Sequence, residues 1–199
     1  DVTLAAGNTY KLSGEYIVEE GATLHIEEGV KIIAVYDDIA DYILVKQGGK
    51  INAVGTPDKP IVMTSEKEEP GAWGGIHICG RAHTNAEGGK GSSEIGGAVY
   101  GGNDDADNSG TLQYIRLEYT GFAFDEEHEA NGISFYGVGN GTIVDHCQAY
   151  KGSDDGFEFF GGSVNVSNLV AVSCSDDSFD WTEGWNGKGT NLVAYQEAE

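Results

Sequence analysis

A pattern near the C-terminus recurs at a fixed spacing and constrains the fold more than any other feature. The segment 153–159, Ser-Asp-Asp-Gly-Phe-Glu-Phe, returns 22 residues later as 175–181, Ser-Asp-Asp-Ser-Phe-Asp-Trp. The run 168–171, Asn-Leu-Val-Ala, reappears 23 residues on as 191–194. A period in the low twenties, built from short β-branched runs and Gly, Asn or Asp turns, is typical of a β-solenoid. Equivalent positions in a solenoid stack strand over strand, about 4.8 Å apart.

The N-terminal third repeats in a different register. Residues 16–24 match residues 24–32 at an offset of eight, and a third copy at 43–51 follows 19 residues later. Alternating apolar residues that are interrupted by Gly predict short strands joined by tight corners. We interpret the offset of eight as consecutive faces of one coil and the offset near 20 as the next coil. Residues 110–121 match 141–152 at 31 residues, which predicts an insertion in that coil.

Composition agrees with one all-β domain over residues 1–199. The chain has 31 Gly and only 3 Pro, and it shows no long helical periodicity. Its length predicts about nine coils of roughly 20–23 residues. Residues 1–15 are expected to form an N-terminal cap or the first coil, 101–110 and 121–131 inserted loops, and the C-terminal end an uncapped coil. The predicted inward stack is Ile26, Val45, Ile51, Ile61, Ile76, Ile78, Leu112, Ile115, Ile133, Ile143, Leu169, Ala171, Leu192 and Ala194.

The charge balance excludes whole classes of partner. Asp and Glu number 33 against 11 Lys and Arg, which gives a formal net charge of -22. A nucleic-acid partner requires a basic face, and this chain has none. No apolar run is long enough to span a membrane. A solvated acidic surface that keeps a secreted protein soluble is one explanation of the charge, and divalent cation binding is the other.

The loop at 101–110 contains a first candidate calcium site. Asp105, Asp107 and Ser109 offer oxygen ligands at alternate positions, and Gly110 follows them. This spacing is the front half of a calcium loop. Arg116 stands where an EF-hand would have its closing Glu, so only a looser calcium loop remains. The alternative is an Asx-rich turn that hydrogen-bonds to its own backbone.

The repeated Asp-Asp pairs give a second candidate site. Stacking would bring together four carboxylates, those of Asp154, Asp155, Asp176 and Asp177, with Glu158, Asp180 and Glu183 close by. Like charges one strand spacing apart repel, so calcium, backbone N–H groups or protons are needed to neutralise some of them. Three interpretations stay open: structural capping of the corner, a calcium site, and catalysis.

Aromatic residues make up a third candidate site. Alternation puts Phe157, Phe159, Phe179 and Trp181 on one face of neighbouring strands. Such a ladder, exposed beside carboxylates, would hold sugar rings; turned inward, it would be core. Trp185, between Gly184 and Asn186, is the better candidate for an exposed ring. We therefore take Phe159, Trp181 and Trp185 as the candidate ligand-binding residues.

Several segments resemble a known group of proteins. Residues 48–65, which lead to Gly-Ala-Trp-Gly-Gly-Ile at 71–76, and the acidic-aromatic segments 154–162 and 176–185 are similar to right-handed parallel β-helix domains of secreted and surface-anchored bacterial proteins. The resemblance covers nearly the whole chain from Tyr16 and implies a right-handed parallel β-helix of the pectate-lyase-like superfold. It also implies a secreted or cell-surface bacterial location. The fold alone does not decide function, because the same superfold hosts polysaccharide-active enzymes and non-enzymatic surface modules.

The residues favour a module over an enzyme. Asp154, Asp155 and Asp177 would imitate the three carboxylates of the polygalacturonase-like pattern, but the chain has no Gly-His-Gly and no basic cluster to hold an acidic sugar. We therefore expect an extracellular binding or structural module that is stabilised by Ca²⁺ and binds a glycan or cell-surface polymer. The alternatives are a glycoside hydrolase or lyase that uses the stacked Asp residues, and a subunit that self-assembles into fibres through its open coil ends.

Overall fold

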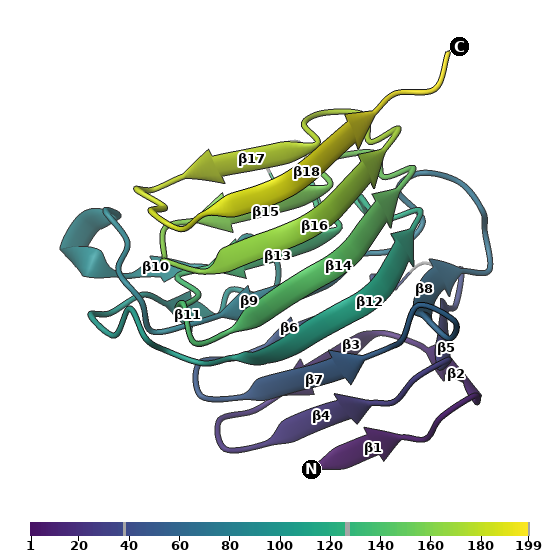
Figure 1. Ribbon diagram of the computed structural model, residues 1–199, viewed down its shortest axis with the longest axis horizontal. Coiled ribbons are helices and arrows are strands. Elements are labelled where there is room, and N and C mark those ends of the chain that lie inside the picture. The colour runs from purple at the N-terminus through teal and green to yellow at the C-terminus, as the bar shows by residue number, and fades with distance from the viewer. Residues whose placement is uncertain (38, 126–127, 199) are drawn as a thin grey trace.

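The computed structural model describes residues 1–37, 39–125 and 128–198 as a stack of parallel coils that rises from the N-terminus to the C-terminus (Figure 1). Each of the first three coils contributes three strands: β1 (Val2–Leu4), β2 (Thr9–Leu12), β3 (Glu15–Val18), β4 (Thr23–Ile26), β5 (Lys31–Ala34), β6 (Tyr42–Val45), β7 (Lys50–Val54), β8 (Ile61–Ser65) and β9 (Ile76–Cys79). The parallel β-helix that the sequence predicts is thereby confirmed, right-handed as expected, and residues 1–15 belong to its first coil.

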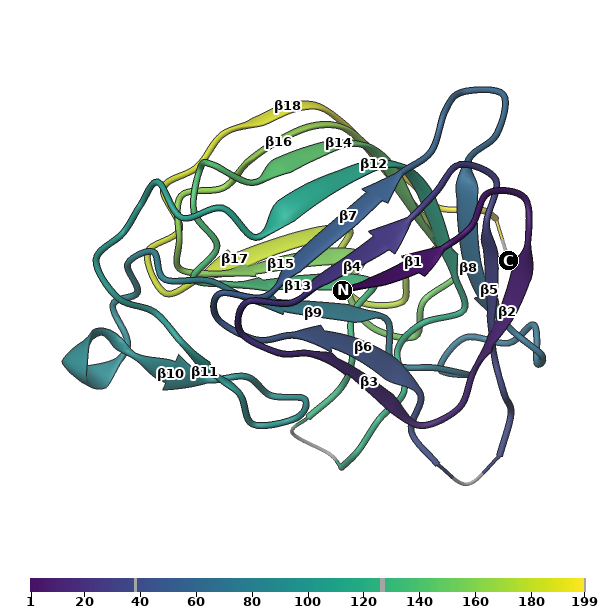
Figure 2. The same ribbon diagram turned by 90° about the horizontal axis from the view of Figure 1, so that it is seen from below.

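The next three coils have two strands each, and one strand follows them. They are β12 (Gly110–Glu118) with β13 (Ile133–Tyr136), β14 (Ile143–Tyr150) with β15 (Phe157–Phe160), β16 (Asn165–Val172) with β17 (Phe179–Thr182), and finally β18 (Gly189–Tyr195). The long strand β12 pairs with both β7 and β8, so two faces of the early coils merge into one bent strand. The view along the stack in Figure 2 shows this bent face opposite the sheet of β3, β6, β9, β13, β15 and β17, which we call sheet B.

The bend in the long strands is a column of left-handed residues. Tyr114, His146, Asn168 and Asn191 have φ of 51°, 51°, 54° and 54°. Asn tolerates this conformation better than most residues because its short polar side chain bonds locally. Asn191 Nδ2 donates to Asn168 Oδ1 at 3.1 Å, and Asn168 Nδ2 donates to Asp145 Oδ1 at 2.8 Å. The repeated Asn therefore turns the last two long strands, β16 and β18, without a loop, and Tyr114 and His146 occupy the same bend in β12 and β14.

Pair registers test the predicted periods. The C-terminal period is confirmed, because Phe157 pairs with Phe179 and Leu169 with Leu192. In the N-terminal third, the offset of eight does mark consecutive faces, as in β3, β4 and β5. The offset near 20 holds between the first two coils, where Val2 pairs with Leu24, 22 residues on. It fails for the copy at 43–51, because Leu24 pairs with Ile51, 27 residues on, and not with Ile43. The expected offset of 31 is 32 in the structure, since Thr111 pairs with Ile143.

The number of coils is lower than predicted. In the described residues the largest sheet stacks seven strands in a row, from β1 through β4, β7, β12, β14 and β16 to β18, whereas about nine coils were expected.

Two insertions account for the difference. The first runs from the end of β9 to the start of β12, residues 80–109, and is three times the predicted 101–110. It holds a 3-10 turn (Glu87–Gly89) and the hairpin β10 (Gly91–Ser92) with β11 (Val99–Tyr100). The second spans the predicted 121–131, of which 126–127 lie outside the described residues.

The core lies between the two faces, as the inward stack predicts, with three exceptions. Eleven of the fourteen predicted core residues are buried. Ile143 is 51% exposed because the register shift of one residue points Val144 inward in its place. Leu192 and Ala194 are exposed because β18 pairs with β16 on one side and no further strand covers it in the described chain. Among the described residues there is no helix long and apolar enough to cross a membrane.

Candidate metal centre

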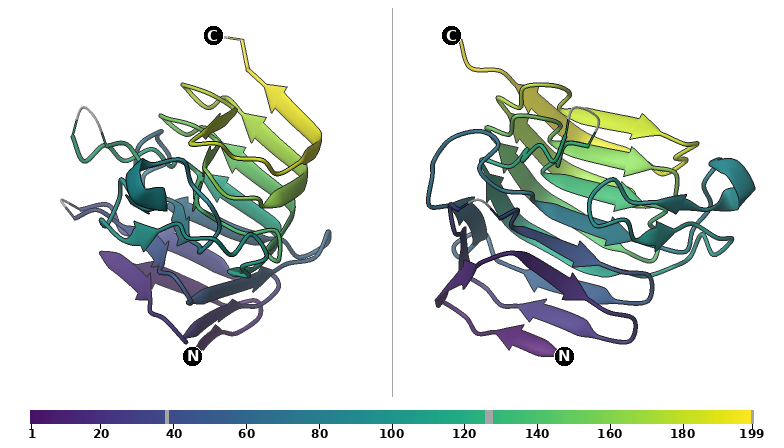
Figure 3. Two further views of the ribbon diagram at one scale, coloured as in Figure 1. Left: turned by 90° about the vertical axis from the view of Figure 1, so that its left-hand side faces the viewer. Right: turned by 180° about the vertical axis from the view of Figure 1, so that it is seen from behind.

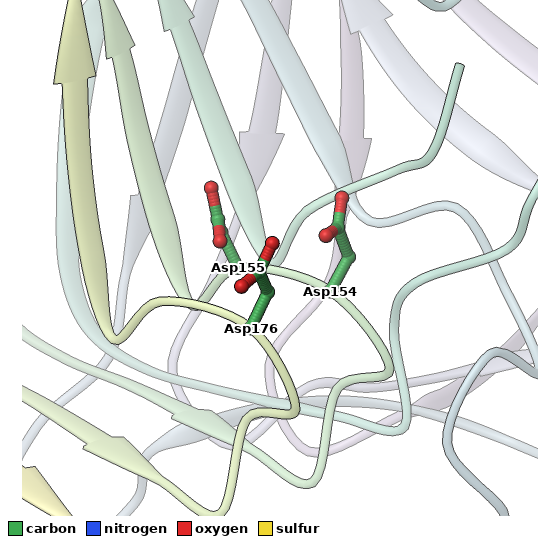
Figure 4. A group of neighbouring side chains, drawn as sticks. All are labelled: Asp154, Asp155 and Asp176. Carbon is green, nitrogen blue, oxygen red and sulfur yellow. The ribbon is translucent and has the colours of Figure 1, made fainter. Parts of the chain in front are cut away.

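The turns that precede β15 and β17 bring three aspartates together. Asp154 and Asp155 precede β15, and Asp176 occupies the equivalent turn one coil later, because β15 and β17 pair in register. One carboxylate oxygen of each residue lies within 4.8 Å of the others. Figure 4 shows the three side chains standing on adjacent turns with their carboxylates close together. We call Asp154, Asp155 and Asp176 the corner triad.

A second triad shares one residue with the first. Glu158 on β15 pairs with Asp180 on β17, and both point away from the core because their neighbours Phe157 and Phe159 point into it. Oxygens of Asp155, Glu158 and Asp180 also lie within 4.8 Å of one another. We call these three residues the strand triad. Asp155 therefore links the two groups.

The two insertions complete an acidic hollow. Glu94 from the first insertion and Glu129 from the second join the five residues of the triads around a cavity of about 210 Å³ that opens to solvent. The ion pairs between described residues leave all seven of these carboxylates out. The hollow thus gathers seven carboxylates outside the ion pairs of the described chain, and the nearby basic side chain of His128 acts electrostatically on one of them, Glu94.

Hydrogen bonds fix the inner wall of the hollow. Asn131 is fully buried; its Nδ2 donates to Glu158 Oε2 at 2.6 Å, and its Oδ1 accepts from the Asp155 N–H at 3.2 Å. The N–H of Asp177 donates to Asp155 Oδ1 at 2.8 Å. These bonds hold Asp155 and Glu158 in place before any ligand arrives, which favours binding because little side-chain freedom is left to lose.

Burial and mutual repulsion raise the pKa of the inner carboxylates. Burial raises the pKa of Glu158 to about 9, and Glu94 and Asp155 add to the effect. It raises the pKa of Asp155 to about 7 despite the Asp177 N–H, and that of Asp154 to about 6 with Glu129 contributing. Burial also raises the pKa of Glu94. A cation in the hollow would remove this cost by favouring the ionised carboxylates.

The chain was compared with known proteins. A family model described as a pectate-lyase like beta helix domain matches residues 1–199. The chain belongs to this family. No curated protein and no solved structure matches it. Family membership confirms the resemblance seen in the sequence, and the function must still be argued from the site.

The other predicted metal ligands of this β-helix lie outside the acidic hollow. The Asp177 side chain is exposed, and Asp177 contributes its backbone N–H instead. In the loop at 101–110, Asp105 Oδ1 lies 2.8 Å from His83 Nδ1 and also accepts a hydrogen bond from the His83 backbone N–H. The Ser109 hydroxyl donates to Asp107 Oδ2 at 3.3 Å. The side-chain bond from His83 lowers the pKa of Asp105. Among described residues, no third carboxylate, His or Cys joins this loop to form a ligand group.

The aromatic ladder of this β-helix faces the core. Phe159 is buried, stacked 5.1 Å from Phe135 and 4.6 Å from Trp185, measured between ring centroids. Trp185 is half-buried and donates its Nε1–H to Val164 O, so it is not the freely exposed ring we expected. Trp181 is 63% exposed in the last coil. The packed rings of Phe159 and Trp185 thus lie on the opposite side of the strands from the carboxylates of Glu158 and Asp180, and Trp181 is the exposed ring of the three candidates.

Sequence reasoning missed two members of the hollow. Glu94 and Glu129 lie in the insertions, outside every repeat, so no stacking rule places them. The sequence predicts that Glu158 and Asp180 lie near the Asp-Asp pairs but leaves their face of the strand open, and the alternation with the buried Phe157 and Phe159 is the signal that could have placed them on the outer face. Glu183 belongs elsewhere: it accepts hydrogen bonds from Tyr100 and Thr84 of the first insertion.

Proposed function

We propose that this pectate-lyase-like β-helix is an extracellular bacterial module, structural or binding, whose acidic hollow holds Ca²⁺. The corner triad is the observation that carries the proposal, because three carboxylate oxygens lie within 4.8 Å of one another. Carboxylates at that separation are stabilised by a shared cation. Calcium therefore turns a repulsive corner into a cross-link between adjacent coils.

The donor set selects the kind of ion. Of the described residues, those that line the hollow are carboxylates and include neither His nor Cys, and all-oxygen sites suit hard cations. Ca²⁺ accepts six to eight oxygens in flexible geometry, whereas Mg²⁺ demands a near-octahedral shell and keeps its water. A solvent-open hollow with more carboxylates than one octahedron needs fits Ca²⁺ better. The loop at 101–110 is left out of the proposal because Asp105 already pairs with His83.

Thermal unfolding with calcium and with a chelator, at matched ionic strength, tests the proposal. An ion that binds only the folded chain at 100 times its Kd stabilises it by about 2.7 kcal/mol. For a domain of this size that corresponds to a rise in Tm of about 5–11 °C. A Tm that is the same in both solutions would reject the calcium proposal.

One observation favours the enzyme alternative. Asp154, Asp155 and Glu158 share a hollow and have raised pKa values, a property of catalytic acids. The spacing argues against an inverting hydrolase, whose carboxyl groups stand about 6.5–9.5 Å apart, since the triad oxygens are within 4.8 Å. Incubation with acidic and neutral polysaccharides, followed by assays for new reducing ends and for unsaturated products, decides the matter. Cleavage that Asp155→Asn abolishes would replace the module proposal.

The fibre alternative rests on a different surface. Val193 and Tyr195 of β18 are 50% and 57% exposed, and in the described chain β18 pairs only with β16. An unpaired strand edge is a template for another chain. Sedimentation velocity over a range of concentrations tests this alternative, which predicts particles that lengthen with concentration; a single species throughout would reject it.

A further inference from the structure

The first insertion is bonded to the last coils through a short segment near its start. In Figure 3 the hairpin of this insertion, β10 and β11, stands out beside the stack of coils. Residues 83–85, ahead of the hairpin, bond to two turns of the stack, at 161–162 after β15 and at 183–184 after β17. We call residues 83–85 the staple. It joins segments that lie up to 101 residues apart in the sequence.

Hydrogen bonds place the staple against both turns. The N–H of Gly162 donates to His83 O at 2.7 Å, and the N–H of Asn85 donates to Glu183 O at 3.1 Å. The carboxylate of Glu183 accepts a hydrogen bond from the Thr84 hydroxyl at 2.6 Å. Glu183 has φ of 53°, a left-handed conformation that costs energy in residues other than Gly. The contacts of the staple offset that cost and hold the turn after β17 in shape.

Both ring nitrogens of His83 face hydrogen-bond acceptors. Nδ1 lies 2.8 Å from Asp105 Oδ1, and Nε2 lies 2.9 Å from Gly184 O. A neutral imidazole carries hydrogen on one nitrogen only, whereas the imidazolium carries hydrogen on both. Both acceptors are therefore satisfied only by the protonated ring. Hydrogen bonds to Gly184 and Asp105 accordingly raise the pKa of His83 above its ordinary value of 6.5.

Among the described residues, three segments contact His83, and the loop at 101–110 supplies its charged partner. Asp105 in that loop accepts hydrogen bonds from the ring and from the backbone N–H of His83. In the turn after β17, the carboxylate of Glu183 is bonded to hydroxyl groups of the first insertion, and the group at Nε2 is the Gly184 carbonyl. The turn at 161–163 is Gly-Gly-Ser and has no ionisable side chain.

We propose that His83 is a pH-sensitive link between the first insertion and the last coil. As the imidazolium it holds the turn after β17 to the insertion. When the pH rises, the ring releases one proton to solvent and keeps the other for Asp105, because a bond to a carboxylate is stronger than one to a carbonyl. The lone pair of Nε2 then faces the oxygen of Gly184, and the turn is released. This link is independent of calcium, because the staple does not line the acidic hollow.

Protonation of His83 favours the closed staple at low pH. A histidine whose pKa is raised in the folded state adds stability below its unfolded pKa of 6.5, and that stability is lost as the pH rises through the raised value. The opening equilibrium of the staple should therefore increase about tenfold for each unit by which the folded pKa exceeds the unfolded one.

Amide hydrogen exchange between about pH 5 and pH 9 measures this opening. The amides of Asn85 and Gly162 donate across the staple, so their protection is the readout, after correction for the intrinsic pH dependence of exchange. Amides of β14 and β16 in the same coils are the reference, because titration of the hollow acts on the fold as a whole. Relative to them, protection of the two staple amides is expected to fall about tenfold for each unit that an NMR titration places the His83 pKa above 6.5.

Substitutions assign the fall in protection to His83. His83→Gln removes the titrating group and is expected to give no fall across this range. Asp105→Asn keeps an acceptor oxygen but removes the charge, so it is expected to lower the His83 pKa and to reduce the fall. His25→Gln, at a histidine of β4, is the matched control and is expected to behave as the wild type. Equal protection at both ends of the range, a fall that persists in His83→Gln, or a His83 pKa of 6.5 or below would overturn the proposal.

Discussion

Replacing Glu158 by Gln is expected to stabilise the metal-free protein and to reduce the stabilisation that calcium adds. Burial raises the pKa of Glu158 from 4.5 to about 9. At pH 7 the folded chain therefore keeps a proton that the unfolded chain has lost. Because pH 7 lies 2.5 units above the unfolded pKa of 4.5, keeping that proton costs the folded state about 3 kcal/mol, at about 1.36 kcal/mol per unit. Because the hollow opens to solvent, we expect Gln to recover about 1–3 kcal/mol.

The same shift sets the pH dependence of the metal-free protein. An acid whose pKa is higher in the folded state binds more protons there, so the free energy of unfolding falls as pH rises between the two pKa values. For Glu158 that window runs from pH 4.5 to about 9. Asp155, with its pKa raised to about 7, adds to the fall in the lower part of the window. Glu158→Gln should flatten the profile, most clearly above pH 7.

Chemical denaturation in the presence of a chelator, from pH 5 to 9, measures both effects. The Gln amide oxygen still accepts the bond from Asn131 that Glu158 Oε2 accepts at 2.6 Å, so the packing is preserved. In calcium, the variant should gain less stability than the wild type because the hollow has lost one of the carboxylates that line it. A metal-free variant that is less stable than the wild type at pH 7, with an unchanged pH profile, would refute the electrostatic account of the hollow.

Two further substitutions test the core and the strand bend. Phe159→Ala removes a buried ring that stacks between Phe135 and Trp185 and should lower the free energy of unfolding by about 3–5 kcal/mol. Trp181→Ala removes a ring that is 63% exposed and should lower it by less than about 1 kcal/mol. Equal losses in denaturant titrations would contradict the inward orientation of Phe159. Asn168→Val forces a β-branched residue into φ of 54° and should lower the free energy of unfolding by about 1–3 kcal/mol. Asn168→Gly should lower it by less. The reverse order would contradict the left-handed bend as the reason for Asn at this position.

The repeats predict the fold because stacking is a local rule. Ser-Asp-Asp at 153–155 and 175–177 recurs at the spacing of the coils it belongs to, and the structure places both turns at the same corner. The rule fails where a coil is irregular. In the N-terminal third, the copies at 24–32 and 43–51 resemble each other because both are strand-corner-strand units, yet β4 stacks on β7 and not on β6. Similar faces of different coils are indistinguishable by sequence pattern alone.

Only part of the acidic hollow could be predicted from the sequence. Alternation along β15 and β17 sends Phe157 and Phe159 inward and Glu158 outward, so the strand triad follows from the sequence once the register is known. Glu94 comes from an insertion that docks through long-range apolar contacts, and no period specifies where such a segment packs. The members of the corner triad could not be told from the sequence either. Adjacent Asp176 and Asp177 look equivalent there, but of the two only Asp176 joins the triad.

That adjacent pair provides the most direct test of the calcium site. Asp176 and Asp177 are both exposed, so replacing either by Asn changes charge equally and disturbs packing little. The measurement is the rise in Tm with calcium, relative to chelator, for Asp176→Asn and Asp177→Asn. The account predicts that Asp176→Asn loses most of the wild-type rise of about 5–11 °C, and that Asp177→Asn keeps it. Equal losses in both variants would mean that calcium responds to general acidity and that the corner triad is not its site.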